Sequence, residues 1–254
     1  MDNKRELKSL LDRYVNSAED RTEIQNLIYR GYLSIGDRLK LDPLRSIRTN
    51  IPELVYAEKK SIKDIEDIIN NSKISNGIIF TRVTEEQMEY FGGRVENLSV
   101  YREAHVMAYK RDIRPVYGPV GILAAGTSDA GVAEECRTVS ELLGIKTEHA
   151  YCTGTVDLYR VVDAIREMEN VKLFILVAGM EVALFTVVSS LTRQPIIAVP
   201  TSAGYGVSDN GKAALHSILL SHSGAVAAVN VDGGTVAALS AFRIMRMFQN
   251  GEEK

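Results

Sequence analysis

Hydrophobic and polar residues alternate in two different ways along the chain. Up to about residue 75 the sequence is highly charged, and apolar residues recur at helical spacing, as at Leu7, Leu10, Leu11 and Tyr14. Helices are therefore expected there, followed by a small α/β unit. Its predicted elements are an extended segment (51–56), a helix capped by Ser61 (61–70), a buried strand (77–80) and a helix capped by Thr84 (84–90).

From Gly118 the pattern changes to a regular alternation of apolar runs and amphipathic stretches. The run 120–125 is continuously apolar, which is typical of a strand covered on both faces. Four further strands are predicted near 147–152, 173–178, 195–200 and 225–231, each followed by a helix. Five βα units in succession predict an α/β fold, with a parallel sheet and helices on both faces. The expected boundary divides the chain into residues 1–117 and 118–254.

Ligands of open parallel sheets bind beyond the carboxyl ends of the strands, so the turns that follow the predicted strands are the candidate site. Every such turn contains glycine, which lets backbone N–H groups approach an anion at a helix N-terminus. These turns predict a nucleotide-binding edge. Its candidate residues are Gly126, Thr127, Ser128, Asp129, Cys152, Gly154, Gly179, Met180, Glu181, Thr201, Ser202, Gly204, Tyr205, Gly206, Asp232 and Gly233.

Each candidate also has a purely structural interpretation. Asp129 and Ser128 could cap the following helix, and Glu181 would be favoured by a helix dipole whatever its function. Arg45 and Arg48 could bind an anion or belong to a solvated charged face. The turns lack the Gly-x-Gly-x-x-Gly and Gly-Lys-Ser/Thr patterns, which argues against redox and NTPase functions. Taken together, the five turns favour a binding site.

Composition narrows the function classes further. The 254 residues carry a net charge of −3, which gives no electrostatic footprint for nucleic acid or an anionic membrane. Two cysteines make neither a disulfide framework nor a zinc site, and no metal site is predicted. No secretory signal or spanning segment is apparent, so a cytoplasmic protein is expected.

The turn motifs resemble those of the LarB family, in the superfamily of the purine-pathway carboxylase PurE. The resemblance rests on Gly-Ile-Leu-Ala-Ala-Gly-Thr-Ser-Asp at 121–129, Val-Ala-Gly-Met-Glu at 177–181 and the stretch 197–206. The segments 41–48 and 52–56 also resemble LarB, whereas plain PurE is shorter and lacks that region. A PurE-like, flavodoxin-like domain is therefore implied for 118–254, behind a LarB-like N-terminal region.

The resemblance implies an enzyme that carboxylates the pyridinium ring of nicotinic acid adenine dinucleotide and hydrolyses its phosphoanhydride, releasing AMP. This is the first step toward the nickel-pincer cofactor. Residues 126–129 would take the phosphate and ribose, Glu181 would face the ring or the hydrolysed phosphate, and 202–206 would wall the carboxylation pocket. Carbon dioxide or bicarbonate is the implied co-substrate. No tightly bound cofactor is expected, and Mg²⁺ is expected only together with the phosphates.

Three departures from the family pattern leave the mechanism open. The family's His-Arg pair matches Tyr159-Arg160, and its cysteine falls in the stretch that contains His222 and Ser223, which has no thiol. The family's Asn-Ile-Asp-Asn-Gly-Phe-Gly is only partly kept, at 230–235. Cys152 is a substitute nucleophile or a buried structural cysteine, and Cys136 is expected in the core. The alternatives are PurE-type chemistry on aminoimidazole ribonucleotide and a nucleotide-binding regulatory protein without catalysis. The resemblance also implies a homo-oligomer, from dimer to octamer.

Overall fold

The computed structural model describes residues 12, 32–35, 39–42, 45–72, 77–111, 113–222 and 226–252. Contacts divide the chain into two compact units, Met1–Arg111 and Asp112–Lys254. The helices expected from Leu7, Leu10, Leu11 and Tyr14 lie outside the described residues, as does Ser223. Each unit is described by itself below.

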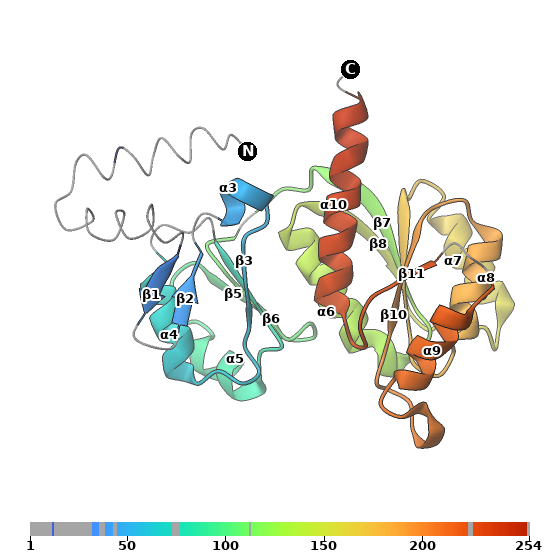
Figure 1. Cartoon of the computed structure of the whole chain (residues 1–254), viewed down its shortest axis with the longest axis horizontal. Coiled ribbons are helices and arrows are strands. Elements are labelled where there is room, and N and C mark those ends of the chain that lie inside the picture. The colour runs from blue at the N-terminus through green and yellow to red at the C-terminus, as the bar shows by residue number, and fades with distance from the viewer. Residues whose placement is uncertain are drawn as a thin grey trace. The chain divides into compact units, whose positions relative to one another are not determined.

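The N-terminal unit contains a four-stranded mixed sheet and a separate two-stranded one (Figure 1). The larger sheet has the order β3-β4-β6-β5, in which β3 and β4 are parallel and the other pairs antiparallel. Its elements are β1 (Leu33–Ile35), β2 (Leu39–Leu41), α3 (Arg45–Thr49), β3 (Glu53–Tyr56), α4 (Ile62–Asn70), β4 (Ile78–Thr81), α5 (Glu85–Phe91), β5 (Leu98–Tyr101) and β6 (Val106–Tyr109).

Local side chains determine where α4 and α5 begin, as predicted. The hydroxyl of Ser61 accepts a hydrogen bond from the N–H of Asp64 at 3.1 Å, and Thr84 accepts one from the N–H of Gln87 at 3.2 Å. The antiparallel pair β1–β2 was not expected, because the charged N-terminal stretch was interpreted as helical. Apolar residues at positions 33, 35, 39 and 41 alternate around a Gly-Asp dipeptide, and that period of two was the missed strand signal.

The C-terminal unit confirms the predicted α/β fold. All neighbouring strands of its five-stranded sheet are parallel, in the order β11-β10-β9-β7-β8. Its elements are β7 (Tyr117–Ala124), a 3₁₀ turn η1 (Thr127–Asp129), α6 (Ala130–Leu142), β8 (Ile145–Ala150), α7 (Leu158–Glu167), β9 (Leu173–Ala178), α8 (Ala183–Leu191), β10 (Ile196–Pro200), η2 (Gly206–Ser208), α9 (Lys212–Leu220), β11 (Val226–Ala228) and α10 (Gly234–Glu252).

Helices cover both faces of this sheet. In Figure 1 the sheet is seen nearly edge-on, with α6 and α10 on one side and α7, α8 and α9 on the other. All six residues of β9 are buried, including Phe174 at 1% exposure, because this strand is central and both faces are covered. Apolar side chains of α7 and α8, such as Val161 and Phe185, pack on it. This continuous burial explains the unbroken apolar runs in the sequence.

The strand order places a topological switch point between β7 and β9. The chain passes from β7 to its neighbour β8 and then returns to β9, which lies on the other side of β7. The connections that follow β7 and β9 therefore run in opposite directions along the sheet. A crevice at such a point is the usual ligand site of open α/β sheets. The fold therefore directs attention to residues 125–129 and 179–182.

Several predicted boundaries differ from the structure, among them that of the strand expected near 147–152, which is β8 (Ile145–Ala150). The last strand was expected over 225–231 but β11 covers only Val226–Ala228, because it lies at the sheet edge and pairs with β10 alone. The helix expected from Glu181 begins at Ala183, which leaves Glu181 in the turn.

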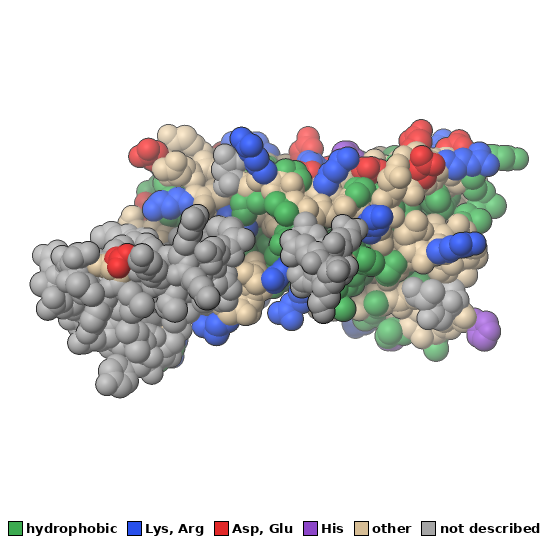
Figure 2. Space-filling model, turned by 90° about the horizontal axis from the view of Figure 1, so that it is seen from above, with side chains coloured by type: hydrophobic (Ala, Val, Ile, Leu, Met, Phe, Trp, Pro, Cys, Tyr) green, Lys and Arg blue, Asp and Glu red, His purple; other side chains and the backbone are tan. Residues whose placement is uncertain are grey.

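Basic and acidic side chains are interspersed on the face drawn in Figure 2. Within the described ranges, no helix combines the length and apolarity needed to cross a membrane.

Candidate functional site

Hydrogen bonds join the five turns at the carboxyl edge of the sheet into one platform. Asp129, after β7, accepts from the N–H of Gly126 at 3.0 Å and from the hydroxyl of Thr201, after β10, at 2.5 Å. The Asp232 carboxylate, after β11, accepts from the N–H of Ser202 at 2.8 Å. All five residues come from the predicted candidate set, and the structure brings them together.

Asp129 lies beneath the turn rather than on its surface. Only 4% of the residue is exposed, and both carboxylate oxygens are bound by groups of the protein. Burial raises the pKa of Asp129, while hydrogen bonds from the Thr201 hydroxyl and from the N–H groups of Gly126 and Gly179 oppose that rise. Although Asp129 is the residue before α6, its side chain does not cap that helix. It organises the turn, and a ligand would meet the neighbouring groups.

Close approach of the turns explains two of the glycines. A Cβ atom at Gly179 would lie 2.4 Å from the Thr201 hydroxyl oxygen, and one at Gly211 would lie 2.7 Å from the Thr201 carbonyl oxygen. Gly211 also has a φ of +85°, which side-chain-bearing residues rarely adopt. Gly126 is different, because a Cβ there would find its nearest neighbour at 3.4 Å. Gly179 is therefore needed for packing, whereas a methyl group at Gly126 would make only ordinary van der Waals contacts.

The turn after β8 is joined to the turn after β9 by a pair of side chains. The hydroxyl of Thr155 donates to the carboxylate of Glu181 at 2.6 Å. Glu181 is half-buried and lies beside Gly154, whose Cβ would be 3.5 Å from its Cγ. Thr155 belongs to one of the candidate turns, but its contact with Glu181 was not predicted, because no local pattern links it to a glutamate 26 positions later. Its position in a turn that follows a strand was the available signal.

Other candidate side chains on the platform face solvent. The predicted residues that are exposed are Thr127, Ser128, Met180, Ser202, Tyr205 and Gly206, while Gly154, Gly204, Asp232 and Gly233 are half-buried. Tyr205 is 83% exposed and Met180 is 54% exposed. Hydroxyl donors and apolar groups thus surround the glycine turns, an arrangement suited to a phosphate attached to a flat ring.

Four further candidates lie elsewhere in the chain: two in the N-terminal unit, one in α7 and one after α9. Arg45 and Arg48 belong to the N-terminal unit, where the Arg48 guanidinium is paired with Asp42. Arg160 is 63% exposed and paired with Asp157 at 3.3 Å. His222 is exposed in the turn after α9.

The two cysteines differ in environment. Cys136 is fully buried in α6, as expected, and burial raises the pKa of its thiol. Cys152 is half-buried and lies two residues beyond β8 instead of ending that strand, with a φ of +58°. Within the described part of the chain, no cluster of three or more His, Cys, Asp or Glu side chains could hold a metal ion. Mg²⁺ bound with substrate phosphates stays a prediction.

Comparison with known proteins accounts for the two units. Residues 119–253 match the family model of AIR carboxylase, and residues 33–111 match that of the LarB/PurE-like N-terminal domain. The chain belongs to the AIR carboxylase family. With its N-terminal domain it is a LarB-type member of the PurE superfamily, as the sequence motifs predicted.

Three proteins that are similar in sequence match different shares of this chain. An uncharacterized protein of Methanocaldococcus jannaschii is 33% identical over 253 residues, which is 95% of this chain and 97% of its own length. An N5-carboxyaminoimidazole ribonucleotide mutase of the same organism is 31% identical over 50% of this chain and 78% of its own length. A probable N5-carboxyaminoimidazole ribonucleotide mutase of Methanobrevibacter smithii is 29% identical over 51% of this chain and 38% of its own length.

Proposed function

We propose that this protein is a LarB-type carboxylase and hydrolase that acts on nicotinic acid adenine dinucleotide. The observation that carries the proposal is the LarB/PurE-like domain at 33–111, joined to a carboxylase-family domain with a glycine-rich edge. The mutase relatives match only about half of this chain, so their activity leaves the N-terminal domain without a role.

The turn at 126–129 is the proposed phosphate site. Thr127 and Ser128 are exposed, and the turn leads into the N-terminus of the thirteen-residue helix α6. Hydroxyl groups, backbone N–H groups and the positive end of a helix dipole all favour a phosphate there. Because Asp129 is held below, its negative charge is kept from the surface that the anion would meet. We assign to this turn the AMP phosphate of the dinucleotide.

Glu181 is the proposed general base for hydrolysis of the phosphoanhydride. Its carboxylate is half-buried at the switch point and is oriented by the Thr155 hydroxyl at 2.6 Å. A carboxylate held in this way can take a proton from water as the water attacks phosphorus. Backbone N–H groups of the neighbouring glycine-bearing turns would stabilise the negative charge that develops on the phosphate oxygens.

Carboxylation requires that the electron-poor pyridinium ring first become nucleophilic. We assign Cys152 as the thiol that adds to the ring, because Cys136 is fully buried and burial raises its thiol pKa. Addition of the thiolate gives a neutral dihydropyridine, whose ring carbon attacks carbon dioxide. Loss of the ring proton and expulsion of the thiolate then restore the aromatic ring. Ser202 and Tyr205 would form a wall of the pocket around the ring.

The direct test incubates the purified protein with nicotinic acid adenine dinucleotide and ¹³C-bicarbonate, with and without Mg²⁺. We expect AMP and a dicarboxylated mononucleotide carrying one label, both detected by mass spectrometry. Glu181→Gln should abolish AMP release, and Cys152→Ser should abolish label incorporation. Tight AMP binding without any product, at every pH and metal condition, would instead favour a regulatory nucleotide-binding protein.

A second candidate is PurE-type chemistry on an aminoimidazole ribonucleotide. It is favoured by the relative described as an N5-carboxyaminoimidazole ribonucleotide mutase, of which this chain covers 78%. Complementation of a purine auxotroph that lacks this mutase separates the two candidates. Growth restored by the wild type and not by Thr127→Ala with Ser128→Ala would support the second candidate.

A further inference from the structure

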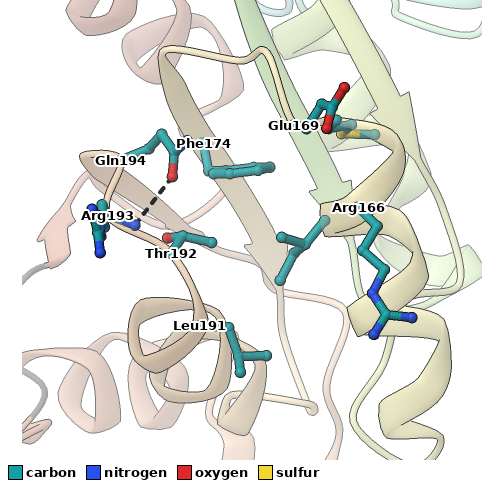
Figure 3. A pocket seen from close by; sticks show the side chains of 9 residues that line it. Arg166, Glu169, Phe174, Leu191, Thr192, Arg193 and Gln194 are labelled. Carbon is teal, nitrogen blue, oxygen red and sulfur yellow. Dashed lines mark hydrogen bonds between the residues drawn. The ribbon is translucent and has the colours of Figure 1, made fainter.

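A pocket of about 370 Å³ lies at the end of the C-terminal sheet opposite to the glycine turns. It is formed by the beginning of β9 and by the last residues of α7 and α8 with the loop that follows α8 (Figure 3). Phe174 is the second residue of β9 and Ala178 the last, so at ~3.3 Å per residue the two ends are roughly 13 Å apart along the strand. The pocket is therefore separate from the proposed catalytic site.

The floor of the pocket is apolar and firmly packed. Phe174 and Met168 are 1% and 4% exposed, and Leu191 contributes a half-exposed side chain. A Cβ at Gly121 on β7 would lie 2.7 Å from the Phe174 ring, so the ring is held directly against the neighbouring strand. Figure 3 shows Phe174 and Leu191 on opposite sides of the open space. A flat apolar group would fit between them.

The polar rim contains two arginines and a glutamate. Arg193 and Thr192 lie at one side of the pocket, and Arg166 and Glu169 at the other (Figure 3). Among the described residues, the Arg193 guanidinium has no ion pair within 4 Å. The buried Thr192 hydroxyl has no hydrogen-bond partner within the same set. Arg166 is paired with Asp163 at 3.7 Å, so Arg193 is the cation at the rim that is available to a monoanion.

We propose that this pocket is a second binding site, for a small aromatic monocarboxylate such as benzoate. The ligand's carboxylate would accept hydrogen bonds from the Arg193 guanidinium and the Thr192 hydroxyl, which supplies the partner that this buried oxygen otherwise lacks. Its ring would lie between Phe174 and Leu191. Glu169 disfavours a dianion, and the volume is near the lower end for ligand pockets, so it suits one ring better than a dinucleotide.

The fold gives such a site a route to the opposite edge. α7 and α8 both begin near the glycine turns, directly after Asp157 and Val182, and both end at the pocket. A ligand that contacts Leu191 and Arg166 therefore touches the far ends of the two helices that follow Thr155 and Glu181. The existence of this binding site does not depend on the proposed function.

Two methionines allow binding at the two ends of the sheet to be distinguished. Met168 lines the pocket, and Met180 lies in the turn after β9. We would label the methionine methyl groups of the full chain with ¹³C, assign both signals with Met168→Leu and Met180→Leu, and titrate benzoate at constant pH and ionic strength. The expected result is a saturable shift of the Met168 signal at millimolar concentrations or below, with the Met180 signal unchanged.

Matched controls test which groups hold the ligand. Benzamide, which has the same shape without the charge, should bind at least tenfold more weakly than benzoate. Arg193→Gln should weaken benzoate binding at least tenfold, whereas Arg243→Gln, on the exposed side of α10, should leave it unchanged. The proposal is overturned if Met168 does not shift, if Met180 shifts instead, if benzamide binds equally well, or if Arg193→Gln binds like the wild type.

Discussion

At Asp129, a carboxylate with 4% exposure is held between turns that follow different strands. The Thr201 hydroxyl and the Gly126 N–H each satisfy one oxygen. A buried carboxylate that loses a hydrogen-bond donor is left with an uncompensated desolvation cost. Each of these two hydrogen bonds therefore has a large effect on the free energy of unfolding. At the residue scale, the geometry of the site therefore depends on groups that no ligand touches.

Replacing Thr201 with valine should lower the free energy of unfolding by about 1–3 kcal/mol at pH 7. The substitution removes a hydrogen bond that opposes the burial-induced rise in the pKa of Asp129, so that pKa rises further. A carboxyl whose folded-state pKa is raised favours folding below its ordinary value of 3.8, and that contribution is lost as pH rises through the folded-state pKa. The deficit of Thr201→Val should thus shrink as pH falls toward 4. Urea denaturation at several pH values measures it, and a deficit equal to that of Thr201→Ser would contradict the prediction.

Gly179→Ala and Gly126→Ala form a matched pair in neighbouring turns. The new methyl group at Gly179 would lie 2.4 Å from the Thr201 hydroxyl oxygen, whereas at Gly126 the nearest atom is 3.4 Å away. We expect Gly179→Ala to cost about 1–3 kcal/mol of stability and to weaken AMP binding. Gly126→Ala should stay within about 0.5 kcal/mol of the wild type. Thermal unfolding and calorimetry with AMP check both, and equal stabilities of the two variants would refute the packing argument.

At the scale of elements, a network of charged groups fastens the edge strand β8 to α6. Arg137 donates to Glu134 at 2.7 Å and to Glu141 at 2.9 Å, and the Tyr151 hydroxyl just beyond β8 also donates to Glu134. Thr147 on β8 donates to Glu141 at 2.7 Å. β8 pairs with β7 alone, so these side chains supply cohesion that a central strand obtains from a second neighbour.

Glu134→Gln should make the free energy of unfolding depend less on pH in the acid range. Burial acts to raise the pKa of Glu134, but hydrogen bonds from Arg137 and Tyr151 and the Arg137 charge outweigh it, so the pKa is lowered. A lowered carboxyl pKa gives stability that is present above the ordinary value of 4.5 and is lost as pH falls through the folded-state pKa. We expect the variant to be about 1.5–3 kcal/mol less stable at pH 7, with the difference shrinking below about pH 4.5. Guanidinium denaturation from pH 7 to 3 measures this difference, and a constant difference would contradict it.

For the whole molecule, exposed apolar side chains of the C-terminal unit support the expected homo-oligomer, which stays a proposal. Leu219 and Leu220 at the end of α9, and Met247 near the end of α10, are 67%, 84% and 74% exposed. These side chains lie on helices that cover opposite faces of the sheet, so each helix end offers its own exposed apolar surface for association.

Light scattering should therefore find between two and eight copies of the chain. Met247→Lys combined with Phe248→Lys should reduce the assembly size, because two charges would have to be buried. Lys63→Glu, exposed on α4, serves as the control that leaves the assembly unchanged. A wild-type monomer at all concentrations would show that no such assembly forms.

Local patterns were sufficient for most of the C-terminal fold. The apolar run at 173–178 predicted a buried strand. The run is unbroken because β9 has neighbouring strands on both sides and helices on both faces. Ser61 and Thr84 predicted helix starts, because capping involves residues only three positions apart. The β1–β2 pair and the antiparallel strands β5 and β6 were missed, since a period of two is hard to recognise in strands of only three or four residues.

The sequence by itself determined that glycine-bearing turns follow each strand of a parallel sheet, because strand periodicity and parallel connections force those turns to one edge. Only the tertiary structure decided what each side chain does there. Asp129 and Thr201 are 72 positions apart and Thr155 and Glu181 are 26 apart, so their contacts follow from strand order rather than from local spacing. The pocket at the other end of β9 likewise exists only because two helix ends and a strand meet. Local patterns are encoded by neighbours in the chain, whereas sites depend on which elements the folded sheet makes adjacent.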